Sequence, residues 1–121
     1  MNTSALLMAL QQKGWYSEEQ ALPDNICQNL LKQLKTHIQE GALKPAQIGT
    51  GSQKQRNSAV RGDSILWMNP ESPLPTEIDF WQWFDSFFSL LNKTLYLGLV
   101  DKELHYAVYP PQSHYEKHVD V

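Results

Sequence analysis

The hydrophobic pattern of this chain changes its period near Gly98. Before that residue, apolar side chains recur every three or four positions, which is typical of amphipathic helices. After it, apolar and polar residues alternate, which is typical of strands. This order predicts an α+β fold with helices first and strands last. Two or three strands cannot form a stable sheet core alone, so we expect them to need the helices or further strands.

Two helices are expected in the first third of the chain. Ser4 is the expected cap of a short helix that ends at Gly14. A longer helix is expected to begin at Pro23 and Asp24 and to stop at Gly41. One apolar stripe runs along the longer helix, so it should pack on another element. The stripe consists of Ile26, Leu30, Leu34 and Ile38.

A third helix is expected to begin at Thr76, with Asp79 completing a capping box, and to end at Gly98. Its apolar face is wide and aromatic, so more than one element should cover it. We expect it to pack against the terminal strands, with Lys93 exposed. The residues expected to be buried there are Phe84, Phe88, Leu91 and Leu95.

The remaining segments are expected to be loops and strands. Residues 44–58 are rich in Gly, Ser and Gln and predict a loop. Residues 60–67 predict a strand pair or a strand with a turn, and Gly62-Asp63 is the expected turn in either case. Alternation predicts strands at residues 104–109 and 115–121, which the Pro110-Pro111 pair separates.

Composition limits the function classes. The 121 residues suit one domain, with 41% hydrophobic and 19% charged residues. A net charge of −3 gives no broad positive surface for nucleic acid. We find neither a membrane span nor a signal peptide, and expect a cytoplasmic protein. The single cysteine, Cys27, allows no intrachain disulfide and is expected to be a buried apolar residue.

The chemical candidate is the tripeptide His118-Val119-Asp120. On a strand, residues two apart point to the same face, so the imidazole and the carboxylate would converge. Together they are two of the three ligands of a 2-His-1-carboxylate site, which holds Fe(II) and leaves positions open for other groups. Alone the tripeptide is a weak signal, and two polar residues on a surface strand would look the same.

The surrounding residues make the signal more specific. Tyr109-Pro110, followed by Tyr115 and then His118 and Asp120, resembles the entry to the catalytic barrel of prolyl-hydroxylase-like Fe(II)/2-oxoglutarate dioxygenases. The spacing looks most like the bacterial members. Residues 61–67, Arg-Gly-Asp-Ser-Ile-Leu-Trp, resemble the Arg-Gly-Asp-x-x-x-Trp stretch that this family places before a long helix. The resemblance covers roughly residues 15–121 and keeps the order of the elements.

The resemblance implies a fold and a site. The chain would be one domain, with helical support over about residues 1–98 and the start of a double-stranded β-helix, or jelly roll, over about 99–121. It implies Fe(II) and 2-oxoglutarate as cofactor and co-substrate, ascorbate as a further candidate, and a prolyl residue of a protein or peptide as substrate. His118 and Asp120 would bind the metal and Tyr109 would lie near 2-oxoglutarate. Tyr115 and Arg61 are the candidate substrate contacts, although Tyr115 reads equally well as a core aromatic.

The family's second iron-binding histidine and its basic 2-oxoglutarate residue have no counterpart in these 121 residues. We therefore expect the chain to be truncated before the barrel is complete and inactive by itself. An alternative function is a non-catalytic module of helices and strands that self-associates, or pairs with another chain, through an unfinished sheet edge. A weaker alternative is a zinc site formed by His105, His114, His118 and Asp120, whose spacing matches no zinc motif.

Overall fold

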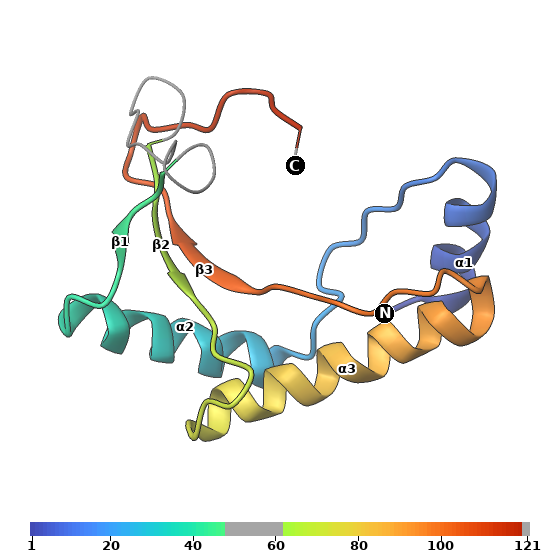
Figure 1. Cartoon of the computed structure of the whole chain (residues 1–121), viewed down its shortest axis with the longest axis horizontal. Coiled ribbons are helices and arrows are strands. Elements are labelled where there is room, and N and C mark those ends of the chain that lie inside the picture. Colours follow the sequence, from blue (N-terminus) through green and yellow to red (C-terminus); the bar gives the residue numbers. More distant parts are fainter. Residues whose placement is uncertain (48–61, 120–121) are drawn as a thin grey trace. The chain divides into compact units, whose positions relative to one another are not determined.

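The computed structural model describes residues 1–47 and 62–119 (Figure 1). Its elements, in order, are α1 (Thr3–Gln12), α2 (Asp24–Gln39), β1 (Lys44–Pro45), β2 (Ser64–Trp67), α3 (Pro75–Leu95) and β3 (His105–Val108). Helices and a small antiparallel sheet confirm the α+β class, whereas the jelly roll stays a prediction.

The chain forms two compact units, and neither is continuous in sequence. The first comprises Met1–Gln33 and Asn69–Lys102, and contains α1 and α3. The second comprises Leu34–Met68 and Glu103–Val121, and contains the three strands with the last turns of α2. The description of residues 1–121 as one domain stays a prediction.

Helix α1 begins at Thr3, two residues earlier than a cap at Ser4 would allow. Asn2 is the cap, and its side-chain oxygen accepts a hydrogen bond of 3.1 Å from the Ala5 N–H. Asn is as good a cap as Ser because its short side chain reaches the same free backbone donor. Gly14 follows the helix with φ +82°, a conformation that ends helices and that glycine adopts readily.

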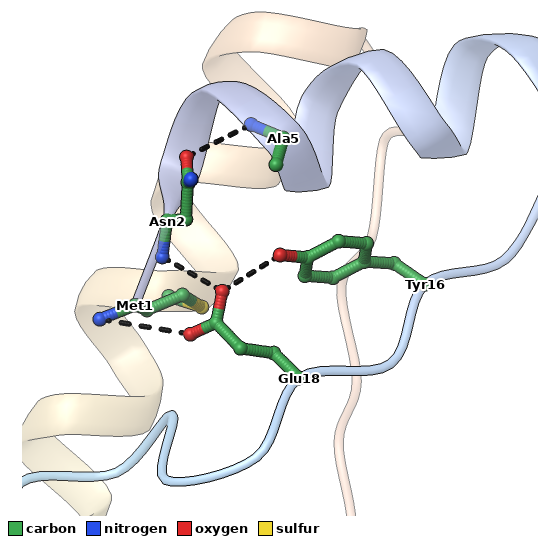
Figure 2. Close-up of polar contacts among 5 residues, drawn as sticks. All are labelled: Met1, Asn2, Ala5, Tyr16 and Glu18. Atoms are coloured by element: carbon green, nitrogen blue, oxygen red, sulfur yellow. Dashed lines mark hydrogen bonds and ion pairs between the residues drawn. The ribbon is translucent and has the colours of Figure 1, made fainter.

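Glu18 ties the start of α1 to the segment that follows this helix (Figure 2). Its Oε1 accepts hydrogen bonds from the Tyr16 hydroxyl at 2.7 Å and from the Asn2 N–H at 2.8 Å, and its Oε2 lies 3.8 Å from the Met1 amino group. These contacts, the Tyr16 hydrogen bond first, hold the pKa of Glu18 below its ordinary value. The same hydrogen bond raises the pKa of Tyr16.

Helix α2 ends as the sequence predicts. Gly41 has φ +68°, and the Ala42 N–H returns to the His37 carbonyl at 3.0 Å, which satisfies an otherwise free acceptor at the helix end. Three residues of the apolar stripe are half-buried, but Ile38 is 48% exposed. The expectation for Cys27 was wrong, because its side chain is exposed.

The start of α3 differs from the expected capping box. The helix begins at Pro75, whose fixed φ and missing N–H suit the first helical position. The cap residue, Leu74, has no side-chain acceptor. The Ser72 hydroxyl accepts the Leu74 N–H at 3.2 Å and donates to Glu77 Oε1 at 2.6 Å, so it ties the cap residue to the first turn of the helix. Thr76 therefore lies inside the first turn and does not cap it.

Helix α3 packs its aromatic side less completely than predicted. Trp81 is buried, and its Nε1–H donates to the Asn69 carbonyl at 3.1 Å. The four residues expected in the core, Phe84, Phe88, Leu91 and Leu95, are half-buried, and Lys93 is exposed as predicted. None of the helices in the described ranges combines the length and apolar character that a bilayer span requires.

The same helix ends three residues before Gly98. Tyr96 follows it with φ +52°, an unusual left-handed conformation for a bulky residue. The Asn92 side chain explains this early end, because it accepts the Leu99 N–H at 2.8 Å and donates to the Leu99 carbonyl at 2.9 Å. The chain thus folds back on the last turn, and an amide side chain, which no periodicity reveals, decides where the helix stops.

The sheet has the order β1-β2-β3, with both neighbouring pairs antiparallel (Figure 1). Ile65 is the central residue, with Lys44 opposite on one side and Ala107 on the other. Strand β3 confirms the predicted alternation. Strand β1 was missed, because its two residues lie in the stretch predicted to be a loop, of which residues 48–58 lie outside the described part.

Removal of the Ser72 hydroxyl should destabilise the protein. Glu77 is 5% exposed, so Ser72→Ala leaves a buried carboxyl without one donor and should cost about 1–3 kcal/mol in urea unfolding of the full-length polypeptide. Ser86→Ala is the matched control: this exposed hydroxyl donates to the Gln82 carbonyl within α3, and its loss should stay within about 0.5 kcal/mol. Equal effects of the two substitutions would contradict the assigned role of Ser72.

Candidate functional site

The sheet in the second unit has one covered and one open face. Residues opposite each other on antiparallel strands share a face, so Leu66 and Tyr106 point one way and Trp67 and His105 the other. Tyr106 is 8% exposed, and its ring lies 5.4 Å from that of His37 on α2. Trp67 and His105 are exposed and meet edge to face at 4.8 Å. Functional groups on this sheet are therefore accessible on the second face.

Tyr109, the predicted co-substrate residue, directly follows β3 and is 46% exposed. If the alternation continues one residue past Val108, Tyr109 belongs to the open face with His105. Its contact with 2-oxoglutarate stays a prediction. A residue that contacts a bound co-substrate must be accessible, and the side chain of Tyr109 is exposed.

A tight turn follows Tyr109 and reverses the chain. The Ser113 N–H donates to the Pro110 carbonyl at 3.0 Å, and the Ser113 hydroxyl donates to the same carbonyl at 2.6 Å. Pro111 occupies the second position, where its fixed φ is favourable, and Gln112 has φ +69° at the third. Two hydrogen bonds and the backbone conformation of the turn therefore hold Ser113 in place.

Gly62 connects this turn to the sheet. Its N–H donates to the His114 carbonyl at 2.8 Å, while the next residue, Asp63, accepts the Ala46 N–H at 2.9 Å. Gly62 and Asp63 therefore extend the pairing of β2 to both sides, and the expected turn at these residues was wrong. Asp63 is only 2% exposed. Gly62 and Asp63 thus contribute backbone contacts, and the contact of Gly62 leads directly to the segment that carries His118.

His118, the predicted metal ligand, is exposed and held by two contacts. Its ring stacks on Tyr115 with a centroid distance of 3.7 Å and an angle of 5°. Its Nδ1 lies 2.8 Å from the Glu116 carbonyl oxygen. A carbonyl can only accept, so Nδ1 must carry the proton, and in the neutral ring the lone pair is then on Nε2. A backbone carbonyl on one nitrogen is a common way to orient a metal-binding histidine.

Tyr115 is half-buried and lies against His118, a position that the sequence could not distinguish from a core aromatic or a substrate contact. The structure adds a third role, since the parallel stack restricts the orientation of the imidazole. A contact between Tyr115 and substrate stays a prediction.

The two other predicted site residues, Asp120 and Arg61, lie outside the described residues. The strand expected over 115–121 is not regular in its described part: Tyr115 forms a single bridge, and residues 116–119 have no strand pairing. The convergence of His118 and Asp120 therefore cannot be argued from strand geometry. Both assignments stay predictions that rest on the motif.

No three metal-binding side chains gather within residues 1–47 and 62–119. This is a correction to the zinc alternative, because His105, His114 and His118 do not converge. His114 instead meets a carboxylate, with Nε2 at 3.1 Å from Glu116 Oε1, and both side chains are exposed. His105 pairs with Trp67. Of these histidines, His118 has its ring oriented by the backbone.

A solved structure matches this chain over almost its whole length. The crystal structure of a Pseudomonas putida prolyl-4-hydroxylase superposes with a TM-score of 0.84 at 29% sequence identity and covers 98% of the chain. The chain spans 60% of the length of that protein. No protein-family model and no curated protein gives a significant match. The fold is thus that of the corresponding part of a prolyl hydroxylase, which supports a dioxygenase-like origin.

The motif singled out His118, Tyr109 and Tyr115 as candidate site residues, but the sequence did not show what holds them. The contact of Gly62 with the turn was misread as a turn of its own. A glycine inside a strand pattern signals the close approach of another backbone, and that signal was present. The Trp67–His105 pair gave no signal, because cross-strand partners depend on a register that the sequence does not state.

The two loop histidines should have opposite tautomers. At a pH where both rings are neutral, His118 should carry its proton on Nδ1, facing a carbonyl, and His114 on Nε2, facing a carboxylate. Nitrogen NMR of the metal-free, full-length polypeptide measures this directly, with His118→Gln and His114→Gln assigning the signals. An Nε2–H form of His118 would show that the Glu116 carbonyl does not orient the ring.

Proposed function

We propose that this chain forms the first part of the catalytic domain of an Fe(II)/2-oxoglutarate-dependent dioxygenase that hydroxylates a prolyl residue in a protein or peptide. The observation that carries the proposal is the match of 98% of the chain, at a TM-score of 0.84, to a prolyl-4-hydroxylase. The Tyr-Pro and His-x-Asp motifs support it independently, because they were recognised from sequence. Since the chain spans 60% of that protein, activity and substrate are both parts of the proposal.

The chemistry of His118 fits a metal ligand. With the proton on Nδ1, the nitrogen that can donate to a metal is Nε2, which is the usual arrangement of a histidine ligand with a carbonyl behind it. The Tyr115 ring limits rotation of the imidazole, so less order has to be imposed when a ligand binds. Imidazole combined with carboxylate is a donor set that suits non-haem Fe(II). His118 and Asp120 would supply two of its three protein ligands.

When bound, Fe(II) would supply the oxidation, in which O2 and 2-oxoglutarate give succinate and CO2 while one oxygen atom enters the substrate C–H bond. The residues of this chain would bind and orient. Tyr109, on the open side of the sheet, would contact 2-oxoglutarate, with ascorbate as a further cofactor. Tyr115 would fix the plane of His118, and Tyr115 and Arg61 would be the contacts to the prolyl substrate.

The alternative is a non-catalytic module that associates through exposed apolar surface. One observation favours it: Tyr96 is 88% exposed, Val100 83% and Leu97 51%, directly after α3. Such a cluster is a common sign of a surface that another element covers. The two functions differ in their need for a metal, so a metal-dependent activity decides between them.

Substitution of either proposed ligand should abolish turnover. In the full-length polypeptide, supplied with Fe(II), 2-oxoglutarate and air, His118→Ala and Asp120→Ala should each lower succinate formation by more than about 100-fold, since even substitutions behind the ligands cost about 10–100-fold. His114→Ala is the matched control, because this exposed histidine lies four residues away in the same segment and should retain most activity. Full activity of His118→Ala would refute the proposed site, and a wild-type polypeptide without any metal-dependent turnover would favour the module.

A further inference from the structure

Gly62 lies unusually close to the turn after β3. A Cβ atom placed on Gly62 would be 2.8 Å from the Cβ of Ser113, a separation that real Cβ atoms essentially never show. It would also lie 3.5 Å from the His114 nitrogen, which is ordinary contact. The φ angle of Gly62 is not in the left-handed region, so the backbone conformation does not demand glycine. Glycine is required at residue 62 because no space is left for a Cβ atom beside Ser113.

Neither side of this contact can easily move. On the turn, Ser113 is held by the hydrogen bonds of its N–H and its hydroxyl to the Pro110 carbonyl. On the sheet, Gly62 is followed by the buried Asp63, whose carbonyl is bonded to Ala46, and then by Ser64, which pairs with Val108. A side chain at residue 62 would therefore push apart two anchored backbones and strain the 2.8 Å hydrogen bond from Gly62 to His114.

The segment beyond that hydrogen bond carries the proposed ligand. The Gly62–His114 bond joins the sheet to the segment one residue before Tyr115, whose ring stacks on His118. A displacement at His114 therefore moves the platform on which the His118 imidazole rests. Displacements well below 1 Å matter at a metal site, because the ligand atoms must meet at fixed distances.

We propose that Gly62 is a positioning residue, which by its close approach to Ser113 and its hydrogen bond to His114 sets the location of His118 relative to the sheet. The role of His118 as a ligand rests on the function proposed above. The positioning of the His118 ring does not, because it concerns the geometry of the metal-free polypeptide. The two claims can therefore be tested separately.

The test is a set of substitutions that add and remove single Cβ atoms in the full-length polypeptide. Gly62→Ala introduces the clash, and Ser113→Gly removes the atom with which the new Cβ collides. The double variant Gly62→Ala/Ser113→Gly should therefore recover wild-type behaviour. Gly62→Ala/Ser113→Ala is the matched control: it loses the same hydroxyl but keeps the Cβ, so it should not recover.

Two measurements follow these variants. Mn(II) titration should show an affinity about 10–100-fold weaker for Gly62→Ala, restored in the Ser113→Gly double variant only. In Gly62→Ala the displaced Tyr115 ring should turn the stacked imidazole of His118 away from the Glu116 carbonyl. Nitrogen NMR of the metal-free polypeptides should therefore show a loss of the Nδ1–H form of His118 in Gly62→Ala and its return with Ser113→Gly. A purely structural role would lower the melting temperature without changing the tautomer or the metal affinity of the folded protein.

Several outcomes would overturn the proposal. These are an unchanged His118 tautomer in Gly62→Ala, and an equal rescue by Ser113→Ala and Ser113→Gly. If Gly62→Ala fails to fold, the Ser113→Gly double variant must fold and keep the Nδ1–H form, and its failure to do so also counts against the proposal. If His118→Ala binds Mn(II) as the wild type does while the tautomer results hold, the proposed function fails and the positioning role of Gly62 stands.

Discussion

The antiparallel pairing of β2 with β3 is the constraint on which the candidate site depends. Four residue pairs, from Ser64↔Val108 to Trp67↔His105, fix which side chains face the covered side of the sheet and which face the open side. A slip of one residue would exchange the two sets. Tyr106 would then lose its place beside His37, and the exposed His105 would take its side. The residues buried on the covered face thus fix the register, and the register decides which side chains are exposed on the open face.

The same register also positions the segment that carries His118. Beyond the Ser64↔Val108 pair, β3 leaves the sheet through the Pro110–Ser113 turn and returns to Gly62, which extends β2. A ladder, a tight turn and one further hydrogen bond thus form a closed loop of contacts. His118 inherits its position from this loop, and its local contacts to Tyr115 and Glu116 then set the direction of the ring.

Much of the fold could be predicted, because periodic patterns report which residues are covered. The three helices and β3 followed from spacing alone, and Gly14 and Gly41 marked two helix ends through their positive φ. The errors occur where single side chains override the pattern. Asn92 ends α3 early by bonding Leu99, and Ser72 holds the start of α3 through Leu74 and Glu77, where Thr76 was expected to cap the helix. Such contacts depend on chain reversals that no local period records.

The sequence was enough to propose the candidate site residues, but it did not show what supports them. Tyr109, Tyr115 and His118 were singled out because their spacing resembles that of a known family. Such spacing can be recognised in a sequence without any knowledge of which residues are in contact. A strand was expected to place His118 and Asp120 on the same face, but residues 116–119 form no strand pairing. The His118 ring is held instead by stacking on Tyr115 and by the hydrogen bond to the Glu116 carbonyl. Close packing against Gly62 could be suspected from a glycine in a strand pattern, but its partner, Ser113, could not.

His118 is proposed to be a metal ligand that this sheet holds in place. Pulsed electron paramagnetic resonance of the full-length polypeptide with Mn(II) in place of Fe(II), compared with and without nitrogen-15 histidine, tests it directly. If His118 is a ligand, the wild type and His114→Gln should show the same histidine coupling, and His118→Gln should couple to one histidine nitrogen fewer. Identical histidine coupling in the wild type and in His118→Gln would contradict it.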